Sequence, residues 1–174
     1  DWYQAAAVRQ LTALLGNPPT ELNYAEHRAR IDSTILEGRK LLLVSHSQGN
    51  LFVNPAYAYA TSKAGAESIK VVHIAPASPT LSGPHTLADL DLVINGLRVV
   101  GSVASITDNI PGFLLRAPGA SGQKDPLGHG LLEIYINQSL AISQRVKNDI
   151  EAALDTLIAP PAQAAAGFFT ATLT

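Results

Sequence analysis

The stretch that decides the fold is KLLLVSHSQGN, residues 40–50. It opens with an apolar run over residues 40–45, which predicts a strand buried on both faces of a parallel sheet. The polar residues that follow lead into residues 48–63, which we expect to be helical, with Pro55 kinking or restarting the helix. A strand, a tight turn centred on Ser47 and a helix are therefore expected in this order.

This order is the geometry of a nucleophile elbow, in which a strained turn lifts a serine hydroxyl above the carboxyl edge of the sheet. Small residues are needed two positions before and after the serine, because strand and helix pass closely there, and Ser45 and Gly49 fill these positions. The amide of Gln48 lies at a helix N-terminus, so we expect it to stabilise an oxyanion. The alternative is an ordinary strand–turn–helix in which Ser47 only caps the helix.

The rest of the chain alternates between apolar strands and helices. A second buried strand is expected within residues 68–78, and a short strand near Thr86 and Leu87. Helices are expected over residues 2–15, between Thr20 and Gly38, from about Leu92, and, as one or two helices, over residues 130–158. This pattern predicts an α/β fold with a parallel sheet flanked by helices, in one domain over residues 1–158. An Ala/Pro-rich tail follows over residues 159–174.

The composition narrows the classes of function. The chain has 174 residues, 47% hydrophobic and 15% charged, which is typical of a globular domain. A net charge of -2 predicts no electrostatic attraction to nucleic acid or to an anionic membrane surface. No apolar run reaches the length of about 20 residues that a transmembrane helix needs. The absence of cysteine excludes disulfides and thiolate chemistry, and no spacing typical of a metal site or a phosphate loop is present.

A serine nucleophile needs a base, and three histidines follow Ser47 in the chain. His73 lies inside an apolar strand and is expected to be a core residue, whereas His85 precedes a short strand and is expected nearer the surface. His129 lies between two glycines just before a helix, and these glycines let the imidazole approach a serine. We therefore predict His129 as the base, the alternative being a surface histidine at a helix start.

The orienting acid is expected between the serine and the histidine in the chain. Asp91 precedes an apolar Leu-Val-Ile run and is our first choice, with Asp89 as the second. Either residue could instead be an N-cap of the following helix. Asp108 and Asp125 are further alternatives, although Asp125 is so close to His129 in sequence that it could shape that loop instead.

Four segments of the chain resemble the α/β-hydrolase superfamily, in particular bacterial lipase/esterase-like serine hydrolases that carry HSQGN at the elbow. They are LLLVSHSQGNLFVN (41–54), VVHIAPAS (71–78), DLVI (91–94) and DPLGHGLLEIY (125–135). The resemblance implies hydrolysis of a small-molecule or lipid ester through an acyl-enzyme, without a cofactor or a metal. It implies Ser47 as nucleophile, His129 as base, Asp91 as acid and the Gln48 amide as oxyanion donor.

The chain departs from this family before the elbow. The family places several strands ahead of the nucleophile strand, whereas the 39 residues before Lys40 are expected to be helical and the chain contains no methionine. We therefore expect the hydrolase fold to be truncated at its N-terminal side, and the open sheet edge to pair with a missing segment or a partner chain. Two alternative functions stay open: a non-catalytic hydrolase-like binding domain, and an acyltransferase that uses the same three residues.

Overall fold

The computed structural model describes residues 20–89, 91–99, 103, 109–110, 125 and 127–160. These residues contain a small parallel sheet, in which each strand lies beside the next one in the chain. Its strands are β1 (Leu41–His46), β2 (Ile69–Ile74), β3 (His85–Ala88) and the two-residue β4 (Asn109–Ile110). The predicted α/β layout, a parallel sheet flanked by helices, is therefore confirmed.

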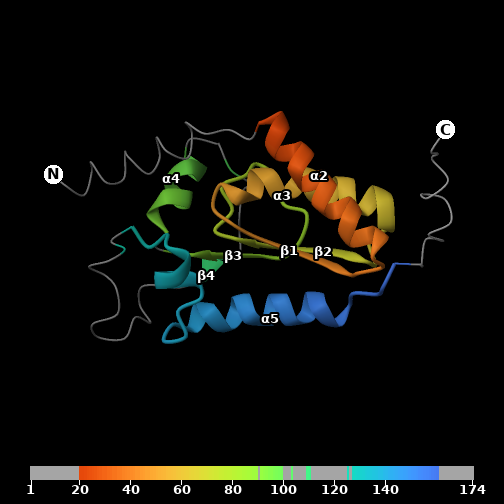
Figure 1. The fold of residues 1–174 in the computed structure, drawn as a ribbon. Coiled ribbons are helices and arrows are strands. Elements are labelled where there is room, and N and C mark those ends of the chain that lie inside the picture. The colour runs from red at the N-terminus through yellow and green to blue at the C-terminus, as the bar shows by residue number, and fades with distance from the viewer. Residues whose placement is uncertain are drawn as a thin grey trace, which may run out of the picture.

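Helices cover both faces of the sheet (Figure 1). α3 (Gly49–Ala64) packs on β1 and β2, and α2 (Glu21–Leu36) packs on α3. α5 (Ala141–Asp155) covers the opposite face, against β2 and β3. The predicted helix over residues 2–15 and the tail beyond residue 160 lie outside the described residues. Within the described part of the chain, no helix is both long enough and apolar enough to cross a membrane.

Local sequence explains where the helices begin and end. Thr20 starts α2 through a capping box with Asn23, in which each side chain accepts a hydrogen bond from the other residue's backbone amide. Gly38 follows α2 with φ +70°, a conformation that favours glycine, as expected for the end of this helix. α3 runs through Pro55 without a break, so of the two effects expected of this proline, a kink or a restart, the restart does not occur.

The burial of β1 differs from the prediction. β2 is almost fully buried, as predicted, but the apolar residues of β1 are only partly buried and Val44 is 45% exposed. The reason is its place in the sheet: β1 pairs with β2 on one side, and in the described residues no strand pairs with its other side. The apolar run correctly predicted a strand, but it did not predict that this strand lies at an edge.

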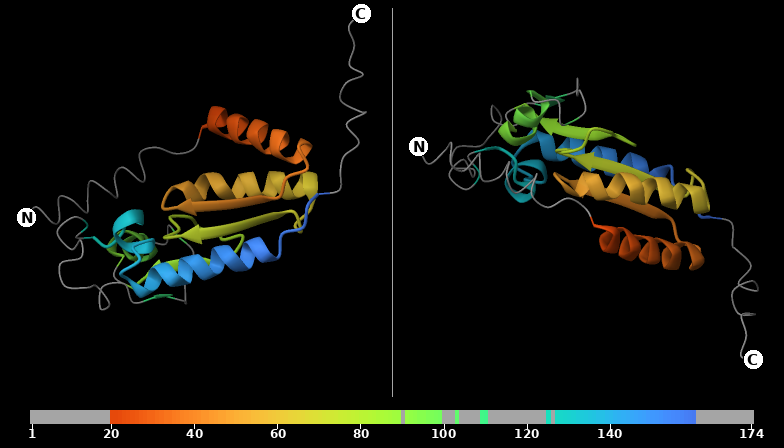
Figure 2. Two further views of the ribbon diagram at one scale, coloured as in Figure 1. Left: turned by 60° about the horizontal axis from the view of Figure 1, so that its bottom comes forward. Right: turned by 90° about the horizontal axis from the view of Figure 1, so that it is seen from above.

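The larger apolar cluster lies where α5, α4 (Leu92–Val99) and a π turn (Leu131–Tyr135) meet the sheet. Ile142 and Val146 of α5 are buried there, and burial of each stabilises the fold by about 1.5–3 kcal/mol. Figure 2 shows that the arrowheads of β1 and β2 point toward the end of the sheet where α4 and the π turn lie. This cluster therefore holds α4 and the π turn beside the carboxyl ends of the strands.

Candidate active site

Ser47 lies in the turn between β1 and α3, with a backbone φ of +55°. This left-handed conformation is uncommon for a residue other than glycine and costs on the order of 1–3 kcal/mol. The end of β2 holds the turn in place: the Ser47 amide donates to the carbonyl of Ile74 (3.1 Å), and the Ser47 carbonyl accepts from the amide of Ala77 (3.2 Å). The strained turn expected of a nucleophile elbow is therefore present.

A network of buried hydrogen bonds around Asn50 holds this turn in place. Asn50 is fully buried, and its Nδ2 donates to the Ser47 carbonyl at 2.7 Å. Its Oδ1 accepts from Ser45 Oγ at 2.6 Å and bonds His73 Nδ1 at 2.7 Å. The Ser82 amide donates to His73 Nε2 at 3.0 Å, so the proton of this imidazole is on Nδ1. No role was predicted for Asn50, although a polar residue in the first turn of the elbow helix was a usable signal.

The position of His73 agrees with its prediction as a core histidine. It is fully buried on β2, and burial, with a smaller contribution from His85, lowers its pKa to about 4. His73 is therefore neutral near neutral pH, as its hydrogen bonds require. His85 pairs with it on β3 and is partly buried, where we had expected a more exposed side chain.

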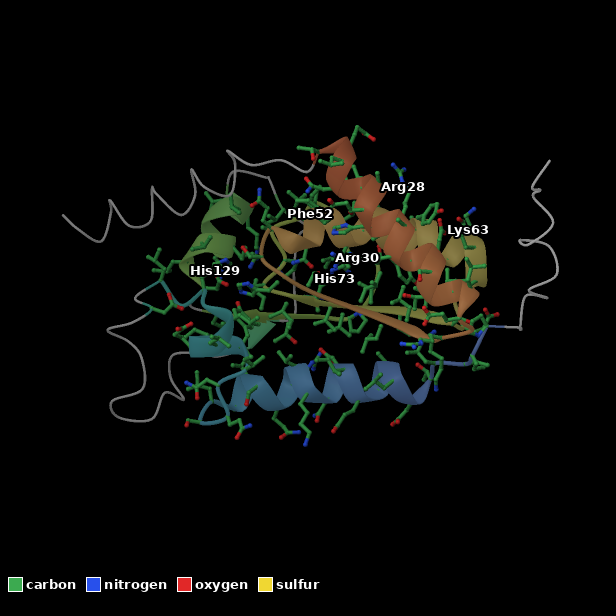
Figure 3. The ribbon with its side chains drawn as sticks, viewed as in Figure 1. Arg28, Arg30, Phe52, Lys63, His73 and His129 are labelled. Atoms are coloured by element: carbon green, nitrogen blue, oxygen red, sulfur yellow. The ribbon has the colours of Figure 1, made fainter. Side chains whose placement is uncertain are left out.

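The three predicted catalytic residues meet beyond the carboxyl end of the sheet, where Figure 3 labels His129. His129 Nε2 lies 2.7 Å from Ser47 Oγ, and His129 Nδ1 lies 2.9 Å from Asp91 Oδ2. Because a carboxylate can only accept, Nδ1 carries the imidazole proton and Nε2 is free to accept from the serine. Asp91 is fully buried and His129 is 8% exposed, so little water competes for these bonds.

Asp91 combines the two roles that the sequence left as alternatives. Its Oδ2 meets His129, while its Oδ1 accepts from the amide of Ile94 at 2.9 Å and so caps α4. The second choice, Asp89, is exposed, and its carbonyl accepts from Asn95 Nδ2. Of the two, the structure brings Asp91 to the histidine. Asp108 lies outside the described residues.

The loop that carries His129 is shaped by its neighbours. Asp125 is buried, and its carboxylate accepts a hydrogen bond from the amide of Gly130, consistent with the expected role in shaping this loop. Gly128 has φ +69°, and a Cβ added to Gly130 would lie 2.5 Å from Glu133 Oε2. The two glycines thus allow the turn and the close packing that set the position of the imidazole.

His46, the residue before the serine, also supports His129, a role that was not predicted. Its Nε2 donates to the His129 carbonyl at 2.8 Å, and the two rings lie 4.9 Å apart between centroids. Burial and, next, the charge of His129 lower the pKa of His46 to about 4, so it stays neutral near pH 7. Successive side chains of a strand point to opposite faces, so the sequence could have predicted that His46 lies on the other side of β1 from Ser45.

Gln48 and Gly49 begin the elbow helix. Gln48 is the N-cap residue of α3, so its amide lies at the helix N-terminus as predicted, and its use by an oxyanion stays a prediction. A Cβ added to Gly49 would lie 3.6 Å from the Cβ of Ser45, an ordinary contact. Strand and helix do approach each other here, but the space would admit an alanine.

A cavity of about 580 Å³ lies between α2, β1 and α3. Apolar side chains make up much of its lining, together with His27 and Arg30, and it extends to Ser45, His46 and Gly49 beside the elbow. Within the part of the chain that the structure describes, no group of three or more His, Asp or Glu side chains is arranged to hold a metal ion.

Comparisons of the chain with protein-family models, with curated proteins and with solved structures found no match. What the chain can do chemically is therefore argued from the arrangement of Ser47, His129 and Asp91 and from the residues that hold them.

Proposed function

We propose that this chain is a serine hydrolase of the α/β-hydrolase type, which cleaves carboxylic esters through an acyl-enzyme on Ser47. The observation that carries the proposal is the hydrogen-bonded series Ser47–His129–Asp91, with bonds of 2.7 and 2.9 Å. The series occurs in the chain order typical of this fold, and its serine lies on a strained strand-to-helix turn. The alternative interpretations, a serine that only caps a helix and a histidine at the surface, would not require the hydrogen bonds that join Ser47, His129 and Asp91.

In the first half of the reaction, Ser47 Oγ attacks the ester carbonyl carbon while its proton moves to His129 Nε2. Asp91 stabilises the imidazolium through the bond at Nδ1. The tetrahedral intermediate then collapses: the bond between carbonyl carbon and alcohol oxygen breaks, and His129 Nε2 returns the proton to the leaving alcohol. The acyl group stays on Ser47.

In the second half, a water molecule replaces the alcohol. His129 Nε2 takes a proton from the water, whose oxygen attacks the acyl carbon. Collapse of the second intermediate breaks the bond to Ser47 Oγ, which recovers the proton from Nε2. If an alcohol takes the place of water, the same steps give acyl transfer.

The developing oxyanion needs donors, and the amide of Gln48 at the N-terminus of α3 is the first we propose. A second donor is expected on a part of the fold that precedes β1. The partly exposed outer edge of β1 supports the further proposal that the hydrolase sheet continues there, through a strand from a missing N-terminal segment or a partner chain.

For the substrate, we propose a small-molecule or lipid ester with an apolar acyl group. The cavity beside the elbow supports this choice, since Leu43, Phe52 and Val53 line it and it extends to His46. The same cavity lies beside β1, whose outer edge pairs with no strand among the described residues. It favours a second candidate function: a non-catalytic domain that binds a ligand or an extended segment of a partner.

Labelling with a fluorophosphonate separates these functions, because only an activated serine reacts with it. We expect one adduct on Ser47, located by peptide mass spectrometry, and its loss in Ser47→Ala and in His129→Ala. Ser62→Ala, which changes an exposed serine on α3 outside the cavity lining, is the matched control and should label like the parent chain.

A folded parent chain that does not label would refute an active hydrolase and would favour the binding domain. If Ser47 labels, p-nitrophenyl esters of increasing acyl length test the preference for apolar substrates. Product analysis with methanol as a competing acceptor then distinguishes hydrolysis from acyl transfer.

A further inference from the structure

Tyr135 is a buried tyrosine whose hydroxyl reaches the site. Its side chain is 0% exposed, and its hydroxyl donates to Asp91 Oδ2 at 2.6 Å while accepting from the amide of Ala88 at 3.1 Å. Burial and, next, the charge of Asp91 raise the pKa of Tyr135 well above its usual value of 10. The hydroxyl therefore keeps its proton near neutral pH and donates it in the hydrogen bond to Asp91.

Three donors surround the carboxylate of Asp91. Oδ1 accepts from the Ile94 amide, whereas Oδ2 accepts from both His129 Nδ1 and the Tyr135 hydroxyl. A buried carboxylate is costly unless it is hydrogen-bonded, so these donors stabilise it. They also fix its rotation, because a turn of the carboxylate plane would break bonds at both oxygens.

A single segment carries His129 and Tyr135 to the acid. The π turn Leu131–Tyr135 connects them, closed by the bond from the Ile136 amide to the Leu131 carbonyl at 2.9 Å. π turns are rare in proteins overall, and those that occur often lie at functional sites. The tyrosine ring also packs edge-on against His46, 5.7 Å between centroids, and His46 in turn donates to the His129 carbonyl.

We propose that Tyr135 is a positioning residue of the catalytic series: it holds Asp91 Oδ2 in the orientation that accepts the hydrogen bond from His129 Nδ1. This inference rests on the proposed hydrolase function. A purely structural role is the competing explanation, since the hydroxyl also satisfies the amide of Ala88. The test must therefore separate an effect that acts through Asp91 from a general loss of packing.

A double-mutant cycle on the full chain makes this separation. The rate constant of fluorophosphonate labelling is measured for the parent chain, Tyr135→Phe, Asp91→Asn and the double variant. Tyr59→Phe is the matched control, because the Tyr59 hydroxyl also bonds a carboxylate, that of Asp32 at 2.8 and 2.9 Å, between α2 and α3.

We expect Tyr135→Phe to lower the labelling rate roughly tenfold in the parent chain, on the scale of one hydrogen bond to a charged group. In the Asp91→Asn background the loss should be less than about twofold, because the carboxylate on which Tyr135 acts is gone. With p-nitrophenyl butyrate, kcat should fall while KM stays unchanged. Tyr59→Phe should leave both the labelling rate and kcat unchanged.

An equal loss in both backgrounds, or no loss in either, would overturn the positioning role while leaving the hydrolase intact. A parent chain that does not label overturns the hydrolase, and this inference with it. If Tyr135→Phe does not fold, Tyr135→4-aminophenylalanine replaces it in the cycle, since the amine keeps the shape and a weaker donor. The same criterion then applies: a loss that depends on Asp91 supports the role, and an equal loss refutes it.

Discussion

Acidification should destabilise this protein through His73, the fully buried histidine of β2. Its imidazole is neutral in the folded chain, because Nε2 must accept from the Ser82 amide while Nδ1 donates to Asn50. Protonation of Nε2 would place a second N–H against that amide and a charge inside the sheet. Protonation of His73 is therefore less favourable in the folded chain than in the unfolded chain.

The magnitude follows from the two pKa values of His73. Burial lowers the pKa to about 4 in the folded state, against 6.5 for an exposed histidine. Above about pH 6.5, His73 is neutral in both the folded and the unfolded chain, so its titration does not lower the free energy of unfolding. As the pH falls from 6.5 to 4, the unfolded state binds the extra proton and the free energy of unfolding drops by about 1.4 kcal/mol per pH unit, roughly 3 kcal/mol in all.

Urea unfolding at several pH values between 7 and 4.5 measures this loss in the parent chain and in His73→Asn. The asparagine keeps a donor near Nδ1 but does not titrate, so the variant should be less stable at pH 7. Between pH 6.5 and 4.5 it should lose about 1.4 kcal/mol less per pH unit than the parent chain. Val72→Ala, at the neighbouring buried position, should be destabilised equally at every pH. His46, whose pKa is also about 4, lowers stability in acid in all three chains. Equal pH dependence in His73→Asn and the parent chain would refute this account.

Three further substitutions test the elbow and the histidine loop. Asn50→Ala should lower the free energy of unfolding by about 3 kcal/mol in urea, because it leaves several buried partners unpaired, whereas the exposed Asn148→Ala should change it by less than about 0.5 kcal/mol. Gly130→Ala should slow fluorophosphonate labelling and lower Tm slightly, since its Cβ would lie 3.1 Å from Asp125 Oδ2, which accepts from the Gly130 amide, and would displace the Glu133 carboxylate. Gly96→Ala in α4, with nothing within 4 Å, should raise Tm slightly. Ser47→Gly should be more stable than Ser47→Ala by about 0.5–1 kcal/mol in urea, because glycine accepts φ +55° without strain; equal stabilities would contradict this.

The sequence predicted what depends on local pattern. The alternation of apolar runs and helical spacings gave the strands and helices in their order, and the residues around Ser47 gave the strained turn. Asp91 and His129 were selected from chain order and loop composition, and they lie within hydrogen-bonding distance of each other. Such predictions succeed because each rests on a few adjacent residues.

Features that depend on distant neighbours were missed. The partial exposure of β1 depends on whether a strand pairs with its outer edge, which its own residues do not determine. The role of Tyr135 was not predicted, because its bond to Asp91 spans 44 positions of the chain. The role of Asn50 likewise depends on His73 of another strand.

The strand order has a consequence for synthesis of the chain. Each new strand joins the sheet beside the one made just before it, so the sheet can grow in the direction of translation. The turn that holds Ser47 can form once β2 has emerged, but His129 follows the serine by 82 residues. In the proposed hydrolase, Ser47 would therefore stay unactivated in a nascent chain until His129 has been made and has docked beside it.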